Sequence, residues 1–167
     1  MKRLLSAVAA AAVLSSMMVM PAAAQNRTVV AQWGRDNGAA VSQQGNRNRA
    51  NVDQRGRVNY SRAVQDGYNN YLRMQQGGSR NEAITEQRGR DNLAVTGQEG
   101  RNLRGETYQA GSGNISGIAQ IGNGSHAVTD QAGRNNTVGV IQVGDNQDAH
   151  VTQTGTGNIS VVIQGGQ

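Results

Sequence analysis

The chain of 167 residues has no Cys, 23 Gly, one Pro and 3% aromatic residues. The lack of Cys excludes disulfides and a lipid-modified Cys, and the shortage of aromatic side chains excludes an ordinary globular core. Basic residues outnumber acidic ones 16 to 11 but are mixed with them, so we do not expect nucleic acid as a partner.

Residues 1–24 have the pattern of a secretory signal peptide. Lys2 and Arg3 precede an apolar run that ends at Met20, and three Ala residues stand just before Gln25. We expect cleavage before Gln25, and the alternative is an uncleaved membrane anchor. The mature chain would then have no membrane span, and its 14 Arg against 11 Asp and Glu give a net charge of +3.

A short segment, residues 25–31, is expected to lead into the array or to form its first strand. From residue 32 to residue 167 a strict period of eleven residues runs without an insertion. A Gln opens each unit: Gln32, Gln43, Gln54, Gln65, Gln76, Gln87, Gln98, Gln109, Gln120, Gln131, Gln142, Gln153 and Gln164. A Gly follows two residues later each time: Gly34, Gly45, Gly56, Gly67, Gly78, Gly89, Gly100, Gly111, Gly122, Gly133, Gly144, Gly155 and Gly166.

An Asn usually stands five residues after the Gln. Alternate units keep it without a break, at Asn48, Asn70, Asn92, Asn114, Asn136 and Asn158. The other units have Asn37, Asn59 and Asn81, and then Leu103, Ser125 and Gln147. The three departures are 22 residues apart, which indicates that two units together form one structural repeat.

The period predicts strands rather than helices. An eleven-residue period can also mark a right-handed coiled coil, but each helical Gly would cost about 1 kcal/mol relative to Ala. Four kinds of residue recur at every second position along a unit. They are the Asn, then a small residue, then a Val, Ile or Thr, and finally the next Gln. They therefore share one face of a strand. Gly permits the backbone angles of a tight corner between strands, so each unit is predicted to be one short strand and one turn, Gln-x-Gly-x-x-Asn.

Two strands and two turns close one rung of 22 residues. The predicted fold is therefore all-β, a β-solenoid of twelve strands in about six rungs, with cross-β spacing. Stacking places identical residues above one another, so the inward Gln and Asn amides are predicted to hydrogen-bond from rung to rung as ladders.

The motif Gln-x-Gly-x-x-Asn-x-Ala, with another Gln eleven residues after the first, resembles the curlin repeat of bacterial curli fibres. It is clearest in QQGNRNRANVDQ (residues 43–54), QRGRDNLAVTGQ (87–98) and QTGTGNISVVIQ (153–164). The resemblance implies a secreted subunit that polymerises with itself and with other curlin subunits into functional amyloid, for adhesion to surfaces and for biofilm matrix. It also implies a curli-type export channel and chaperones as partners. Curlin major subunits have a Gly-rich leader that is not found before Gln32. The residues fit either a major subunit or a nucleator subunit.

The outward positions predict two different faces. One sheet should present a column of Tyr60, Glu82, Arg104, His126 and Asp148, with Glu82 paired to Arg104 and His126 paired to Asp148. The other should present Leu93, Ile115 and Ile159, an apolar face suited to lateral packing or adhesion. The alternative reading of the second face is scattered exposed aliphatic side chains.

Other classes of function have less support in the residues. His126 and His150 fall diagonally on adjacent rungs, but two imidazoles without a third ligand are a weak metal site. We expect no cofactor, and no grouping of nucleophile, base and orienting residue predicts an enzyme. The alternative is a soluble solenoid that binds ice, nucleic acid or a metal. Ice binding would need an outward Thr array, whereas Thr85, Thr107 and Thr129 are predicted to point inward. The array also continues to its end without a capping element, which favours pairing with other copies.

Overall fold

The computed structural model describes residues 25–166, which form an all-β solenoid. The expected signal peptide lies outside the described residues. Within the described part, no helix is long and apolar enough to cross a membrane.

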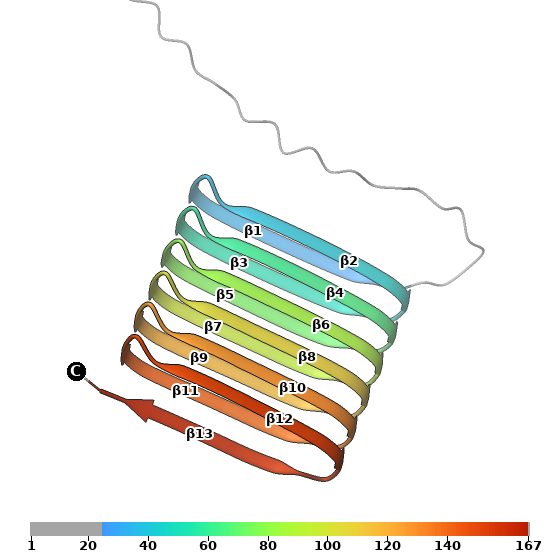
Figure 1. Cartoon of the computed structure of the whole chain (residues 1–167). Helices are drawn as coiled ribbons and strands as arrows, with labels where there is room; N and C mark the ends of the chain where they lie inside the picture. The colour runs from blue at the N-terminus through green and yellow to red at the C-terminus, as the bar shows by residue number, and fades with distance from the viewer. Residues whose placement is uncertain (1–24, 167) are drawn as a thin grey trace, which may run out of the picture.

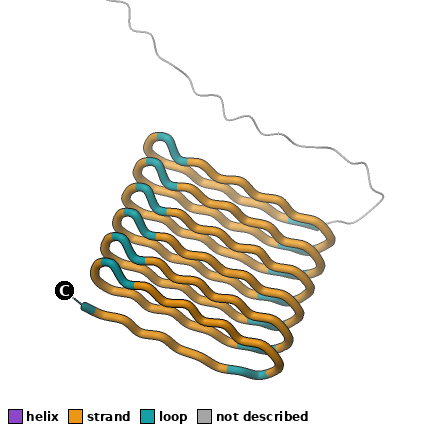
Figure 2. Tube along the Cα trace, in the orientation of Figure 1, coloured by secondary structure: helices purple, strands orange, loops and turns teal. Residues whose placement is uncertain are grey.

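Thirteen strands follow one another along the chain, with two residues between consecutive strands (Figures 1 and 2). They are β1 (Arg27–Arg35), β2 (Gly38–Asn46), β3 (Arg49–Arg57), β4 (Tyr60–Tyr68), β5 (Tyr71–Ser79), β6 (Glu82–Arg90), β7 (Leu93–Arg101), β8 (Arg104–Ser112), β9 (Ile115–Asn123), β10 (His126–Arg134), β11 (Thr137–Asp145), β12 (Asp148–Thr156) and β13 (Ile159–Gly165).

The strands form two parallel sheets. The odd sheet has the order β1-β3-β5-β7-β9-β11-β13, and the even sheet has the order β2-β4-β6-β8-β10-β12. Each strand pairs with the strand 22 residues later, so that Gln54 lies beside Gln76 and Gln65 beside Gln87. The predicted β-solenoid with a 22-residue rung is therefore confirmed, at about six turns.

Two details differ from the prediction. The strands number thirteen rather than twelve. The additional strand is β1, because residues 27–31 already have the alternating pattern of a strand and pair with β3. The strands are also long, nine residues in most cases, because pairing continues through Gln-x-Gly into the corner. Only two residues, such as Val58 and Asn59 between β3 and β4, remain outside the strands.

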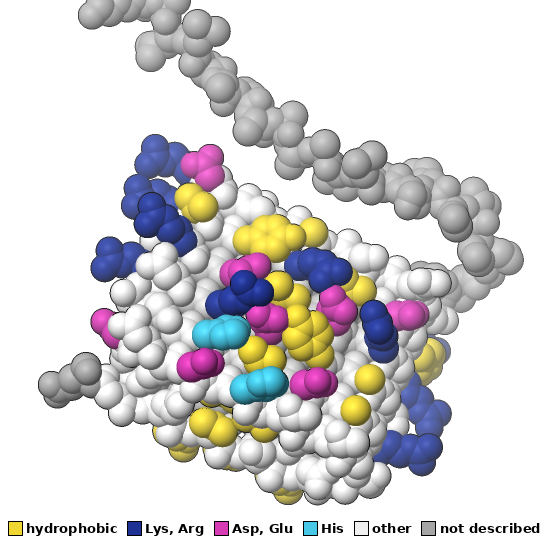
Figure 3. All heavy atoms as spheres, in the orientation of Figure 1, with side chains coloured by type: hydrophobic (Ala, Val, Ile, Leu, Met, Phe, Trp, Pro, Cys, Tyr) yellow, Lys and Arg dark blue, Asp and Glu magenta, His cyan; other side chains and the backbone are white. Residues whose placement is uncertain are grey.

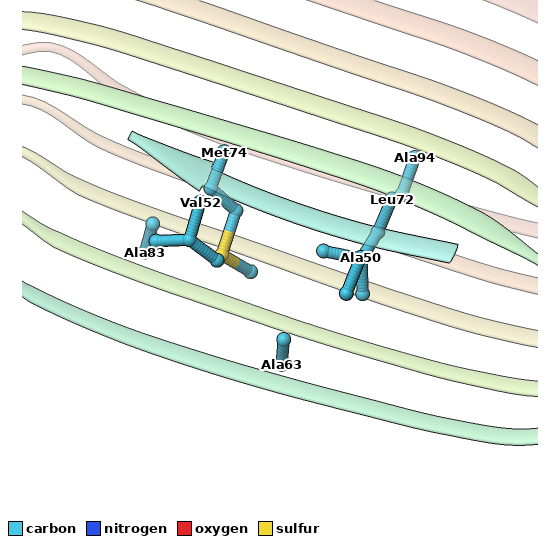
Figure 4. Close-up of a cluster of buried hydrophobic side chains, with 7 residues drawn as sticks. All are labelled: Ala50, Val52, Ala63, Leu72, Met74, Ala83 and Ala94. Atoms are coloured by element: carbon cyan, nitrogen blue, oxygen red, sulfur yellow. The ribbon is translucent and has the colours of Figure 1, made fainter. Parts of the chain in front are cut away.

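The interior is a narrow stack of alternating apolar and amide rows. One apolar cluster, drawn in Figure 4, contains Ala50, Val52, Ala63, Leu72, Met74, Ala83 and Ala94. A second cluster, farther along the solenoid, contains Ile118, Ala127, Val138, Val140, Ala149 and Val151. Hydroxyls lie between the clusters, where Ser116 is 2.8 Å from Thr129 and 3.3 Å from Thr107. Thr85, Thr107 and Thr129 are buried, as predicted, so they form no outward Thr array.

Candidate functional site

The inward Gln side chains form one continuous ladder in each sheet. From Gln32 to Gln142, each Nε2 donates to the Oε1 of the Gln 22 residues later, as Gln76 does to Gln98 at 2.8 Å and Gln87 to Gln109 at 2.9 Å. Nε2 also donates across the interior to a carbonyl oxygen of the other sheet, such as that of Tyr60 for Gln76, at 3.0 Å. The amides therefore connect successive rungs and also connect the two sheets.

The Gln residues of the inner strands are buried, and so is Gln153 on the edge strand β12, whereas those on the other edge strands are less buried. The buried members are Gln54, Gln65, Gln76, Gln87, Gln98, Gln109, Gln120, Gln131, Gln142 and Gln153. Gln32, Gln43 and Gln164 lie on β1, β2 and β13, where one side of the strand has no neighbour among the described residues.

The Asn side chains bind mainly to the corner backbone. Asn114 Oδ1 accepts the backbone N–H of Asn136 at 3.1 Å, and Asn114 Nδ2 donates to the carbonyl oxygen of Gly133 at 3.1 Å. Direct amide contacts between Asn side chains also occur, for example from Asn92 to Asn70 at 3.1 Å. The predicted Asn ladder therefore understated the role of the backbone, because a short Asn side chain reaches the corner carbonyl before it reaches another amide.

The sequence reading missed one member of the Asn column. Asn26 Oδ1 accepts the N–H of Asn48 at 2.9 Å, and its Nδ2 donates to the carbonyl oxygen of Gly45 at 3.0 Å. Asn26 could have been predicted from the sequence, because it stands 22 residues before Asn48. In the other column, Leu103 is buried and its N–H still donates to Asn81 Oδ1 at 3.1 Å. An apolar side chain is tolerated there because the backbone supplies that bond.

The corner Gly residues are fixed by close stacking of backbone on backbone. From Gly34 to Gly155, the twelve corner Gly residues have φ between 94° and 143°. A Cβ on Gly34 would lie 1.9 Å from the carbonyl oxygen of Gly56 on the next rung, closer than any side chain tolerates.

A second left-handed residue stands two positions after each of these corner Gly residues. It is usually Asp, Asn or Gly, which tolerate that conformation, but Arg47, Val58 and Arg80 also adopt it, with φ of 58° to 59°. The motif did not predict this position, since its residue type varies from unit to unit.

The outer face of the even sheet carries a charged cluster around Glu106 (Figure 3). Glu106 accepts hydrogen bonds from Arg104 and from the Tyr108 hydroxyl, the latter at 2.6 Å, and its Oε1 is 3.4 Å from His126 Nε2. The predicted column pairs are confirmed, with Arg104 3.2 Å from Glu82 and His126 3.6 Å from Asp148. The reading of a single column missed Glu106, which stands two residues along β8 from Arg104.

His126 and His150 lie on neighbouring strands but are two residues apart in register, since His126 pairs with Asp148 and His150 pairs with Val128. Within residues 25–166, no group of three or more His, Cys, Asp or Glu side chains is placed to hold a metal ion.

The cluster shifts three pKa values, and that of Arg104 is raised mainly by its hydrogen bond to Glu106. Partial burial opposes ionisation of Glu106, but hydrogen bonds from Tyr108 and Arg104 outweigh it, and the pKa of Glu106 is lowered. The hydrogen bond to Glu106, together with partial burial, raises the pKa of Tyr108 to about 12.

The Tyr108 shift predicts a loss of stability in alkali. A raised pKa means that the neutral phenol stabilises the folded state below its unfolded pKa of about 10, and that this stabilisation disappears as the pH rises towards 12. Between pH 9 and pH 12, the unfolding midpoint in denaturant should therefore fall more steeply for the natural chain than for Tyr108→Phe. Parallel curves for the two proteins would contradict the assignment of the shift to this hydrogen bond.

The outer face of the odd sheet becomes apolar towards β13. Across β9, β11 and β13 the outward side chains are aliphatic, Thr, Gly or Ala, apart from Asn123 and Asp145 at the corner. The exposed members of this apolar face are Ile115, Ile121, Ile141, Val143, Ile159, Val161 and Ile163. They are neighbours on adjacent strands rather than scattered single residues.

Parallel 22-residue rungs and buried amide ladders define a tandem-repeat β-solenoid. The family model of the curlin associated repeat matches residues 45–78, 127–155 and 133–166. The chain belongs to the curlin family, a family of structural subunits rather than enzymes. A comparison with curated proteins gives no match.

Proposed function

We propose that the mature chain is secreted and polymerises end to end, through the edge strands of its solenoid, into extracellular amyloid-like fibres. The fibres would serve adhesion and biofilm matrix, with other curlin subunits and a curli-type export channel as partners. The expected signal peptide and membership of the curlin family support this proposal.

The exposure of the interior at the two edges of the solenoid is the main support for end-to-end polymerisation. The inner rows are closed within the solenoid and open at its edges: Val30 on β1 is 43% exposed, whereas its register partner Val52 on β3 is 0% exposed. A further copy that paired with the edge strands would bury the open rows and extend both Gln ladders. Exposed strand edges pair readily with other chains.

The test uses purified residues 25–167 over a range of concentrations. The expected result is a lag phase, then growth of fibres that bind amyloid dyes, with the lag removed by preformed seeds. A chain that remained monomeric for days at high concentration would contradict end-to-end polymerisation.

The apolar face of the odd sheet favours a second role, in lateral bundling or adsorption to apolar surfaces. A contiguous exposed apolar patch commonly marks an interaction surface. Ile121 on β9 is 55% exposed and lies beside Val143 on β11.

Ile121→Lys should therefore reduce adsorption of fibres to a hydrophobic surface by about three-fold or more, because it places a charge in the patch. Ala132→Lys is the control, since it adds the same charge to the outer face of the even sheet, between Ala110 and Thr154. Equal adsorption of the two variants, at equal fibre mass, would show that the apolar face is not the adhesive surface.

A further inference from the structure

The number of strands restricts how one subunit can stack on the next. Of the thirteen described strands, seven lie in the odd sheet and six in the even sheet. At one edge of the solenoid, β13 is outermost in the odd sheet and β12 is outermost in the even sheet, half a rung earlier. A second copy related by translation alone would place its β1 on β13 and leave a gap one strand wide beside β12.

A half-turn about the solenoid axis removes that gap. The β1 strand of the second copy then pairs with β12, and its β2 pairs with β13. All strands stay parallel, because consecutive strands of the solenoid run in opposite directions on its two sides. Within the subunit, strands pair so that residues at the same place in the eleven-residue unit lie side by side.

The same register gives compatible pairs across this junction. Inside, Val30 would lie beside Val151 and Gln32 beside Gln153, which continues one Gln ladder. On the other side, Val41 would lie beside Val162 and Gln43 beside Gln164. Outside, Arg27 would lie beside Asp148, whose side chain is 79% exposed. Translation would instead place Arg27 beside Ile159.

An unpaired atom lies at the place where the second copy would bind. Gln147 Oε1 is buried and has no hydrogen-bond partner among the described residues. In this column a side-chain oxygen accepts the backbone N–H of the residue 22 positions later, as Asn59 accepts from Asn81 at 3.1 Å and Ser125 from Gln147 at 3.2 Å. In the half-turn arrangement, the N–H of Asn26 from the second copy occupies that position. Translation moves Asn26 to Asn158 and leaves Gln147 without a donor.

We propose that successive subunits in the fibre are related by half a turn about the solenoid axis, so that the even sheet of one subunit continues into the odd sheet of the next. This rests on the proposed end-to-end polymerisation. The apolar patch of the odd sheet then alternates between the two sides of the fibre from one subunit to the next.

Engineered disulfides distinguish the two arrangements, and the chain has no Cys of its own. The half-turn places outward Ala31 beside Thr152, and Ser42 beside Ile163, whereas translation places Ala31 beside Ile163. Directly paired strand neighbours lie about 4.8 Å apart, within the Cα separation that a disulfide accepts. The members of each pair lie on strands at opposite ends of one subunit, so a bridge must join two subunits.

Three double variants are polymerised under reducing conditions, oxidised as fibres and separated on a non-reducing gel. Ala31→Cys with Thr152→Cys, and Ser42→Cys with Ile163→Cys, should give ladders of linked subunits. Ala31→Cys with Ile163→Cys is the matched control, since each of its cysteines also occurs in one of the other variants. It should link at least about five-fold less, because its thiols lie on different sides of the fibre.

Linkage in the control variant and not in the other two would overturn the half-turn and leave end-to-end polymerisation intact. Fibres in which none of the three variants links would also overturn it. A natural chain that forms no fibres would instead refute the proposed function itself.

Discussion

Gly133→Ala is expected to destabilise the stacked solenoid by more than about 3 kcal/mol. Gly133 has φ 126°, and an added Cβ would lie 2.0 Å from the carbonyl oxygen of Gly155 on the next rung. That carbonyl also accepts a hydrogen bond from Asn136 Nδ2 at 3.1 Å, so moving it aside breaks a second contact. Backbone strain and steric overlap therefore act at the same corner.

Gly139→Ala is the control for this substitution. Gly139 lies on β11 with no atom within 4 Å of the added Cβ, and its φ is not in the left-handed region. There the change should be neutral, or stabilising by about 0.5 kcal/mol, since Ala loses less conformational freedom on folding. Denaturant midpoints and rates of fibre growth for the two variants give the comparison. Equal effects would contradict the steric account of the corner.

Gln76→Ala should cost at least about 3 kcal/mol, because it removes one unit of a buried ladder. Gln76 Oε1 accepts from Gln54 Nε2 and from the Ser61 hydroxyl, both at 2.7 Å. Its own Nε2 donates to Gln98 and to the carbonyl oxygen of Tyr60. The substitution leaves these four groups short of a partner, and each unsatisfied buried group costs about 1–3 kcal/mol.

The chain provides the control at the adjacent position. Gln75→Ala removes the same atoms from the outward, exposed neighbour and should change stability by less than about 0.5 kcal/mol. The free energy of unfolding from denaturant titration separates the two variants. If the two substitutions cost the same, the buried amides do not contribute to stability as the hydrogen bonds imply.

The fold could be predicted because one short pattern repeats without an insertion. Alternation along each unit assigned Gln54 and Val52 to the interior, and the 22-residue spacing of the departures predicted two strands per rung. The lengths of the strands could not be predicted, because pairing through Gly56 depends on the carbonyl of Gly78 that lies against it.

The side-chain contacts on the outer surface were harder to predict from the sequence. The pairs within one column, such as Glu82 with Arg104, followed from the period alone. The central position of Glu106 did not, because it depends on side chains that reach along and across strands, such as Tyr108 and His126. The unpaired oxygen of Gln147 likewise appears only when the rungs are stacked.

X-ray diffraction from aligned fibres of residues 25–167 tests the central claim most directly. If subunits stack through the edge strands, the solenoid axis lies along the fibre, and a strong reflection near 4.8 Å should lie on the meridian. The same reflection on the equator would show that the solenoids join through their outer faces, with their axes across the fibre, and would contradict assembly through the open edges.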